Sequence, residues 1–407
     1  MTGKLSIEEL KALFASDAVF ALIDVREQAE HQAEQILCST QVSLRDLIRI
    51  VGHLVPRKNT QLVLYSGEEK RAGEGAALLR EEGYSEVAVL AGGLRDWKEA
   101  GEEVYAGIHV FSKLFGEVLY HSGREEIREI TGEALYDRIA AGEDVRVIDV
   151  RPVNEVAETG TIPGAVNIPG VELPFYISDQ KREGRQIVLT CAGRTRGYVA
   201  AAGIGLLGLA GVLDLENGTK GWHFAGHEIE PLAEGHAFAE LPGPSAEAAE
   251  AARRALQTLA VREGIPLISA EELRRAIAGD RPVNLLDVRQ EEEYRSGHIR
   301  GSRSFPGGQA VQNTDESAFL HGALHVFTDD GDGRAILTAY WFTRMKLRAA
   351  VLAGGNRAWR EAGGEWDSGT GFDEQWHDSF TGRSLEEEHR YIEWEKELIN
   401  KKGRNLL

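Results

Sequence analysis

The stretch Val147-Ile148-Asp149-Val150-Arg151 occurs three times in this 407-residue chain with little change. The other two copies are Leu22-Ile23-Asp24-Val25-Arg26 and Leu285-Leu286-Asp287-Val288-Arg289. Each copy is a short apolar run that ends in an acidic and a basic side chain. Short β-branched runs without alternation are typical of strands buried on both faces. A unit that recurs at a fixed interval indicates repeated domains.

A second apolar run follows each copy at a constant distance. From Asp149 to Cys191, the last residue of the second run, is 42 positions, and the same count holds in the other two repeats. A Gly-x-x-x-Trp element closes each repeat, 72 or 73 positions after the aspartate. The second runs are Leu62 to Ser66, Ile187 to Cys191 and His325 to Asp329, and the closing residues, which we expect to anchor the core, are Trp97, Trp222 and Trp359.

Helical patterns alternate with these strands. Capping boxes begin helices at Ser6 and Ser269, Thr131 holds the matching place in the second repeat, and further helices are expected over 72–81 and 197–207. The fold class is therefore α/β, with three tandem domains, each a mostly parallel sheet flanked by helices. Ligands of such sheets bind at the carboxyl ends of the strands, where Cys191 is placed.

The repeats divide the chain into six segments. Their lengths agree with the usual size of compact domains. The expected boundaries are 1–101 for the first domain, 102–125 for a spacer, 126–232 for the second domain, 233–264 for a second spacer, 265–365 for the third domain and 366–407 for a tail.

Composition limits the partners and the compartment. The formal net charge is −19, which argues against nucleic acid or an anionic membrane as the main partner. Two cysteines exclude a disulfide framework and favour a reducing setting. No apolar run approaches the ~20 residues that a membrane-spanning helix needs, and the first residues do not form a signal-peptide pattern. We therefore expect a cytoplasmic protein.

The loop Cys191-Ala192-Gly193-Arg194-Thr195-Arg196 carries the chemistry. Its backbone amides are expected to converge on an anion, and the helix that follows adds partial positive charge. Together with Arg194 and Arg196 these groups favour the thiolate, which is the nucleophilic form of cysteine. The corresponding loops begin with Ser66 and Asp329 and have no sulfur, so we expect both to be catalytically silent.

These features resemble the rhodanese superfamily. The residues that match are Asp-Val-Arg with a downstream acid such as Glu293, the Gly297-His298-Ile299 element with Gly301, the strand-Cys-loop-helix, and the closing tryptophan. The second repeat keeps the Gly-His-Ile element as Gly160-Thr161-Ile162, and the first repeat has lost it. The resemblance implies three rhodanese-like domains, of which only the second is active.

The resemblance also implies sulfurtransferase chemistry. Cys191 would take sulfur from an anionic donor such as thiosulfate, hold it as a persulfide and pass it to a thiophilic acceptor. Residues Ala192, Gly193, Arg194, Thr195 and Arg196 would bind the anion. No cofactor and no metal are expected. Asp149 and Arg151 recur in the silent repeats and are interpreted as structural, with a supporting role near the active loop left open.

Three alternatives remain. The first is a binding module that senses sulfane sulfur or docks a partner. The second is a mercaptopyruvate sulfurtransferase, disfavoured by the two arginines of the loop. The third is a phosphatase or arsenate reductase, whose arginine follows the cysteine by six positions in related enzymes, whereas Arg196 follows Cys191 by five.

Other residues receive structural interpretations. We expect the arginines of the silent loops, Arg71 and Arg334, to neutralise their own acidic loops. The third loop is interpreted as a solvated acidic loop formed by Asp329, Asp330 and Asp332. It is not interpreted as a calcium loop, because a calcium loop would need a downstream glutamate. Cys38 aligns with Gly301 and is expected to be a small buried residue.

If the silent repeats assist catalysis, the spacer should bring Lys113 or Phe115 over Cys191. An amphipathic helix from Ser384, with Tyr391, Trp394 and Leu398 on one face, is expected to dock on its own domain or to mediate a homodimer.

Overall fold

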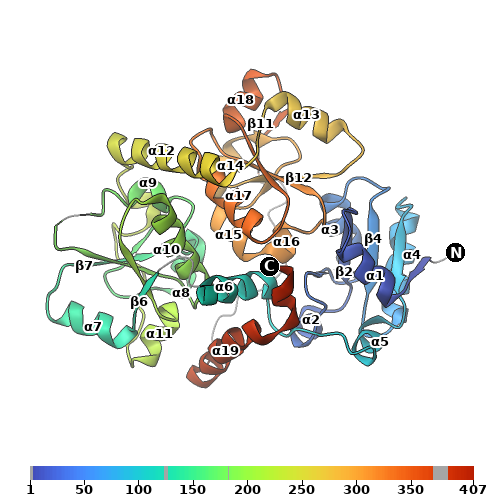
Figure 1. The fold of residues 1–407 in the computed structure, drawn as a ribbon, viewed down its shortest axis with the longest axis horizontal. Helices are drawn as coiled ribbons and strands as arrows, with labels where there is room; N and C mark the ends of the chain where they lie inside the picture. The colour runs from blue at the N-terminus through green and yellow to red at the C-terminus, as the bar shows by residue number, and fades with distance from the viewer. Residues whose placement is uncertain (1–2, 123–126, 182, 370–383) are drawn as a thin grey trace.

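Three sheets with the same strand order follow one another along the chain. In the computed structural model, which describes residues 3–122, 127–181, 183–369 and 384–407, each sheet has five strands, and all of its pairings are parallel. Figure 1 shows the three lobes in blue, green and orange, with helices on both faces of each sheet. The expected α/β architecture is confirmed.

The first repeat forms a sheet in the order β1-β5-β4-β2-β3. Asp24, the last residue of β2, lies opposite Tyr65, the last residue of β4. Its strands are β1 (Gly3–Leu5), β2 (Phe20–Asp24), β3 (Thr40–Gln41), β4 (Gln61–Tyr65) and β5 (Val87–Leu90), and its helices are α1 (Ile7–Phe14), α2 (Gln28–Ala33), α3 (Leu47–Leu54), α4 (Glu69–Glu81) and α5 (Gly93–Glu99).

The second repeat has the order β6-β10-β9-β7-β8, and Asp149 lies opposite Thr190 in the same register. Thr131 caps α7, accepting a hydrogen bond from the amide of Ala134. The strands are β6 (Arg128–Ile130), β7 (Val145–Asp149), β8 (Val166–Asn167), β9 (Gln186–Thr190) and β10 (Val212–Leu215), and the helices are α7 (Gly132–Ala140), α8 (Val153–Thr159), α9 (Leu173–Tyr176), α10 (Thr195–Leu207) and α11 (Gly218–Phe224).

The third repeat has the order β11-β16-β15-β12-β14, with Asp287 opposite Thr328. A small antiparallel pair, β13 with β17, is added outside this sheet. The strands are β11 (Leu267–Ile268), β12 (Val283–Asp287), β13 (His298–Ile299), β14 (Arg303–Ser304), β15 (Leu324–Thr328), β16 (Ala349–Leu352) and β17 (Trp366–Asp367), and the helices are α13 (Ala270–Ala278), α14 (Glu291–Ser296), α15 (Gly307–Gln312), α16 (Thr314–Ser317), α17 (Arg334–Arg344) and α18 (Gly355–Glu361).

The connecting segments are largely helical and lie between the repeats. The first spacer forms α6 (Val110–Ser122), which packs against α10, and the second contains the short helix η1 (Phe238–Glu240) and α12 (Ala246–Glu263), which packs against α9 and α17. Spacer residues 123–126 and tail residues 370–383 are outside the described residues. One hydrophobic core therefore runs from the second repeat through α6 and α12 into the third.

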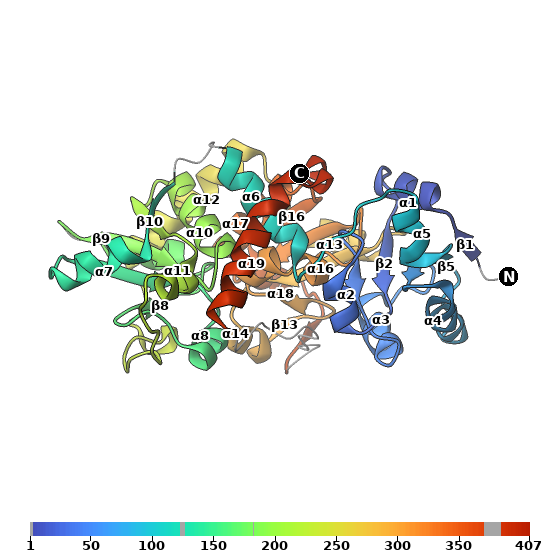
Figure 2. The ribbon, with the colours of Figure 1, turned by 90° about the horizontal axis from the view of Figure 1, so that it is seen from below.

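The tail helix α19 (Leu385–Glu397) begins with a capping box at Ser384 and is followed by η2 (Leu398–Asn400) and η3 (Lys402–Leu406). It packs against α6 and α11, and Figure 2 shows it in red beside α6. The apolar side chains of this tail contact the same chain, since Ile392 of α19 and Leu398 of η2 are buried. A homodimer through this helix stays a prediction. In the described part of the chain, no helix combines the length and apolar composition needed to cross a membrane.

Two predicted helices begin earlier than expected. We predicted starts at residues 72 and 197, but α4 begins at Glu69 and α10 at Thr195. The loop after the second strand is so tight that its last residues already have helical geometry. The last two residues of the Cys191 loop, Thr195 and Arg196, therefore belong to the first turn of α10.

Candidate active site

Cys191 directly follows β9, at the carboxyl edge of the second sheet. Its thiol is buried, with only 2% of the residue exposed. The backbone amide of Gly193 lies 3.4 Å from Sγ and points at it. The sulfur therefore lies at the carboxyl edge of the strand, as expected, and it faces the amide of Gly193.

The first residues of the helix α11 contact the backbone of the Cys191 loop. The amide of Thr219 donates a 2.7 Å hydrogen bond to the carbonyl of Cys191. Gly218 makes this approach possible, because a Cβ at that position would lie 2.2 Å from the same carbonyl oxygen and its φ is +56°. The Gly-x-x-x-Trp element thus positions the active loop as well as anchoring Trp222, which is buried.

The loop groups favour the Cys191 thiolate as expected, but in this conformation burial outweighs them. Burial raises the pKa of the Cys191 thiol, and the carboxyl of Asp214 adds to the rise. The guanidinium of Arg196 and the amides of Gly193 and Gly197 act in the opposite direction but do not compensate. The loop groups stabilise an anion at Sγ, whereas the surrounding protein excludes the water that would otherwise solvate it.

Arg194 does not face an incoming anion. Its Nε donates to Oε1 of Glu117 at 2.6 Å, and its guanidinium lies 4.6 Å from the ring centre of Tyr120. Both partners belong to α6, the spacer helix. Arg194 and Glu117 are each at least nine-tenths buried, so this ion pair ties the spacer to the loop.

Arg196 is also paired with a carboxylate. Its two terminal nitrogens donate to the two oxygens of Glu155, at 2.5 and 2.7 Å. Glu155 lies 3.7 Å from Arg151, which in turn forms a fork with the buried Asp149. Asp149 and Arg151 therefore reach the active loop through Glu155, and their own contacts are those of a strand-end ion pair.

The tail helix and α11 cover the remaining side of the loop. Thr195 donates a hydrogen bond to Glu395 of α19, and Lys220 of α11 donates one to the carbonyl of Ala192 at 3.0 Å. A Cβ on Gly193 would lie 3.9 Å from Tyr391 and 4.0 Å from Ile392. The amphipathic helix after Ser384 is thus a wall of the site.

Four charged residues of the site escaped the sequence reasoning: Glu117, Glu155, Lys220 and Glu395. Three of them are carboxylates from other elements. Glu155 holds the place of Glu293, six residues after the strand-end aspartate, whereas nothing in the local sequence marks Glu117 or Glu395. Lys220 did leave a signal. It stands two residues before Trp222, and the other repeats have Arg95 and Arg357 at the same place.

The spacer contributes different residues from those expected. Lys113 is buried and donates to the carbonyl of Ile108, with its ammonium 5.0 Å from the Tyr391 ring. Phe115 packs against Trp341 of the third repeat. The contacts with the loop come instead from Gly116, which packs against Thr195, and from Glu117.

The loop of the third repeat already holds an anion. The carboxylate of Asp329 accepts hydrogen bonds from the amides of Gly331, Gly333 and Ala335, at 2.7 to 3.0 Å. Burial raises the pKa of Asp329 to about 6. The predicted amide cradle is therefore formed here, and its own aspartate fills it.

The arginines of the silent loops are only partly as expected. Arg71 does not neutralise its own loop, because it pairs with Glu30 at 2.6 Å. Arg334 pairs with Asp332 of its own loop at 2.9 Å, but also with Glu293 and with Glu172 of the second repeat. Among the described residues, no group of three or more metal-binding side chains is placed to hold an ion.

Cys38 has the backbone conformation that its alignment with Gly301 indicates, but it is only partly buried, not buried as expected. Its φ is +64°, close to the +79° of Gly301, and burial raises the pKa of its thiol to about 12. A thiol with this pKa is protonated at neutral pH and does not act as a nucleophile.

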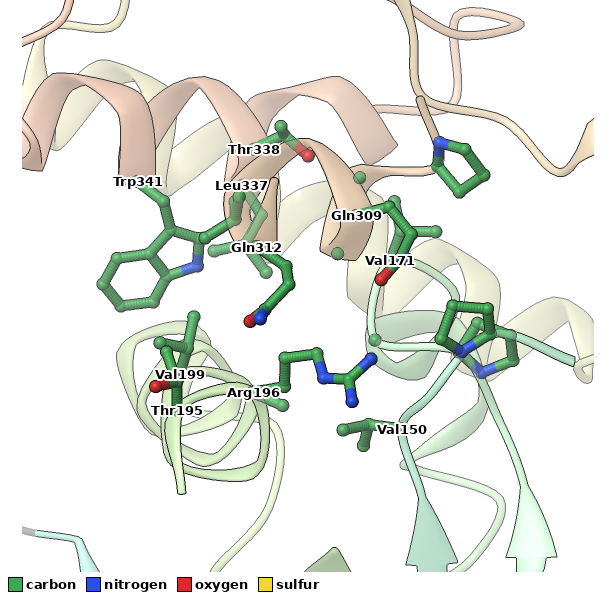
Figure 3. A pocket seen from close by; sticks show the side chains of 18 of the residues that line it. Val150, Val171, Thr195, Arg196, Val199, Gln309, Gln312, Leu337, Thr338 and Trp341 are labelled. Carbon is green, nitrogen blue, oxygen red and sulfur yellow. The ribbon is translucent and has the colours of Figure 1, made fainter. Parts of the chain in front are cut away.

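A cavity of about 70 Å³ adjoins Arg196 between the second and third repeats. Figure 3 shows the Arg196 guanidinium on one side of it and Gln312 and Trp341 on the other. Most of its lining is apolar. The side-chain oxygens of Gln309 and Gln312 are buried without a hydrogen-bond partner in the described part of the chain. The cavity therefore offers two unsatisfied acceptors beside the arginine of the active loop.

The family model of the rhodanese-like domain matches residues 6–100, 131–225 and 269–362. The chain belongs to the rhodanese family. Each match covers four of the five strands of one sheet, so the protein has three rhodanese-like domains in tandem.

Known sulfurtransferases resemble single repeats of the chain or the whole of it. A sulfurtransferase of Allochromatium vinosum is 34% identical over 96 residues, which is 24% of this chain and 88% of that protein. A thiosulfate:glutathione sulfurtransferase of Saccharomyces cerevisiae is 27% identical over 108 residues, covering 24% of this chain and 78% of the relative. The structure of a thiosulfate sulfurtransferase from Pseudomonas aeruginosa matches 99% of this chain and 98% of its own, with 25% identity and a TM-score of 0.86.

Proposed function

We propose that this protein is a sulfurtransferase in which Cys191 carries sulfane sulfur from an anionic donor such as thiosulfate to a thiophilic acceptor. One observation carries the proposal. Three strand–loop–helix units have the same register, and only the second has a sulfur atom at its first loop position, with the amide of Gly193 directed at it. The sulfurtransferases among the relatives support the same chemistry.

The reaction proceeds in two displacements. The Cys191 thiolate attacks the outer sulfur of thiosulfate, the S–S bond of the donor breaks, and sulfite leaves with the bonding electron pair. The enzyme then holds a persulfide anion at Cys191. A thiophilic acceptor such as cyanide or a thiolate attacks the outer sulfur, and the Cys191 thiolate leaves. The amides of the loop stabilise both anionic forms of the cysteine.

Cyanolysis of thiosulfate tests the proposal. We expect thiocyanate formation by the wild type and by Ser66→Ala, which alters the same position in a silent repeat, and none by Cys191→Ser. Mass spectrometry should find one added sulfur atom on the Cys191 peptide and none on the Cys38 peptide. Equal activity of the wild type and Cys191→Ser would overturn the proposal.

The burial of Cys191 favours one alternative, a module that senses sulfur without turning it over. Such a module would take one sulfur atom from thiosulfate and retain it when cyanide is added. Rapid loss of the added sulfur to cyanide supports turnover. Mercaptopyruvate and an aryl phosphate, supplied in place of thiosulfate, test the two enzymatic alternatives, and we expect slower reaction with the former and none with the latter.

A further inference from the structure

We propose that Lys220, rather than Arg194 or Arg196, binds the sulfonate end of the donor. This inference rests on the proposed function and names the residue that selects an anionic donor. Lys220 belongs to α11, the helix whose first residues hold the carbonyl of Cys191.

The ammonium group of Lys220 lies against the active loop. Its Nζ donates to the carbonyl of Ala192 at 3.0 Å, and it stands 5.6 Å from the centre of the Tyr391 ring. An ammonium group has three N–H donors, so two remain available. In the described part of the chain, no carboxylate oxygen lies within 4.0 Å of this nitrogen.

The other two cations of the loop are already neutralised. Arg194 pairs with Glu117 and Arg196 with Glu155, and both carboxylates are largely buried. If either arginine turned toward a donor, it would leave a buried carboxylate without its partner, which is strongly unfavourable. Lys220 can bind an anion without breaking an ion pair.

The repeats provide an internal comparison. In the first repeat, Arg95 occupies the position of Lys220, and it pairs with Asp96 and with Glu68 of the silent loop. In the third, a Cβ on Gly331 of the loop would lie 3.3 Å from Arg357. The basic residue two positions before the closing tryptophan therefore reaches the loop in all three repeats. The active repeat has Gly193 where the first has Glu68, so its cation lacks that carboxylate.

The charges around Lys220 come from three elements. Glu388 and Glu395 of α19 and the thiol of Cys191 favour its protonated form, while Arg196 opposes it. Burial has the largest effect and lowers the pKa of Lys220. This ammonium is poorly solvated and has no ion-pair partner among the described residues. Its electrostatic attraction for a dianionic donor is therefore stronger than that of an exposed lysine.

The test compares Lys220→Gln, Lys220→Arg and Arg95→Gln with the wild type. Arg95→Gln removes the matching cation of a silent repeat. Two donors are used, thiosulfate and the uncharged dimethyl trisulfide. The measurements are KM and kcat for cyanolysis of thiosulfate, and the rate at which each donor adds sulfur to Cys191. Thermal melting checks that each variant is folded.

We expect Lys220→Gln to raise KM for thiosulfate by about tenfold to a hundredfold, since one charge-assisted hydrogen bond is lost. Its kcat should change little, and its reaction with dimethyl trisulfide should match the wild type. Lys220→Arg should restore most of the affinity, and Arg95→Gln should behave as the wild type.

Two outcomes overturn the inference alone. One is an unchanged KM for thiosulfate in Lys220→Gln. The other is an equal loss with both donors, which would mean that Lys220 acts on the thiol or on the loop. If the wild type takes sulfur from neither donor, the proposed function itself fails.

Discussion

The hydroxyl of Thr195 donates a 2.7 Å hydrogen bond to Oε1 of Glu395, which lies 200 positions further along the chain. Thr195 is the first residue of α10, and Glu395 is in the last turn of α19. Glu395 is only 1% exposed. The tail helix therefore forms part of the wall around Cys191, and access to the sulfur depends on how firmly this helix is docked.

Loosening α19 should expose Cys191. Ile392 is buried against the loop, and Ile392→Ala removes packing worth about 2–5 kcal/mol at a buried site. The undocked fraction of the helix then rises, so we expect iodoacetamide to alkylate Cys191 at least about tenfold faster. Leu385→Ala, at an exposed position of the same helix, is the control and should not change the rate. An unaltered rate in Ile392→Ala would mean that α19 does not limit access.

Removing the partner of Arg194 should destabilise the protein. Glu117→Ala leaves a buried guanidinium without its carboxylate, which typically costs about 3–5 kcal/mol. We expect a clear fall in the midpoint of urea unfolding. Glu8→Ala breaks the exposed pair with Lys11 and should leave the midpoint unchanged. A similar small effect in both variants would show that the Glu117–Arg194 pair contributes little.

The reactivity of Cys191 should keep increasing with pH. Burial raises the pKa of this thiol, and only the thiolate reacts, so below that pKa the rate rises about tenfold per pH unit. The alkylation rate should still be climbing above pH of about 8.5, the ordinary value for cysteine. Arg196→Gln removes a cation that lowers this pKa, so its profile should move to higher pH. Cys38, with a pKa raised to about 12, serves as the slow internal reference. A plateau near neutral pH would contradict the expectation.

The glycine four residues before the closing tryptophan should be required for activity only in the second repeat. A Cβ at Gly218 would lie 2.2 Å from the carbonyl oxygen of Cys191, and one at Gly93 would lie 2.5 Å from that of Ser66. Both glycines have positive φ, so alanine at either position costs about 1–3 kcal/mol and shifts the loop. We expect thiosulfate cyanolysis per folded molecule to fall sharply in Gly218→Ala and to remain normal in Gly93→Ala. Equal activities would show that α11 does not position the active loop.

The strand pattern made the fold predictable. Asp24, Asp149 and Asp287 end their strands opposite the residue before the loop in every repeat, as the constant spacing requires. The capping boxes located helix starts because a cap is a contact within four residues. The starts of α4 and α10 were missed by two or three residues because a tight loop already has helical geometry at its end.

The roles of the arginines could not be predicted in the same way. Arg194 and Arg196 look like anion-binding groups within the loop, yet each is occupied by a carboxylate from another element. Arg71 similarly pairs with Glu30, 41 positions earlier. A long side chain selects its partner in space, so nearby sequence does not reveal whether its charge is free.

The sequence by itself determined the three rhodanese-like folds and the uniqueness of Cys191, because both depend on residue identity and on short, regular spacings. Only the tertiary structure decided how that thiol is surrounded. The spacer helix supplies Glu117, the tail helix supplies Glu395 and a wall of apolar side chains, and α11 supplies Lys220. Burial and ion pairing depend on which distant segments pack together, and these two effects set the charge and the accessibility of the sulfur.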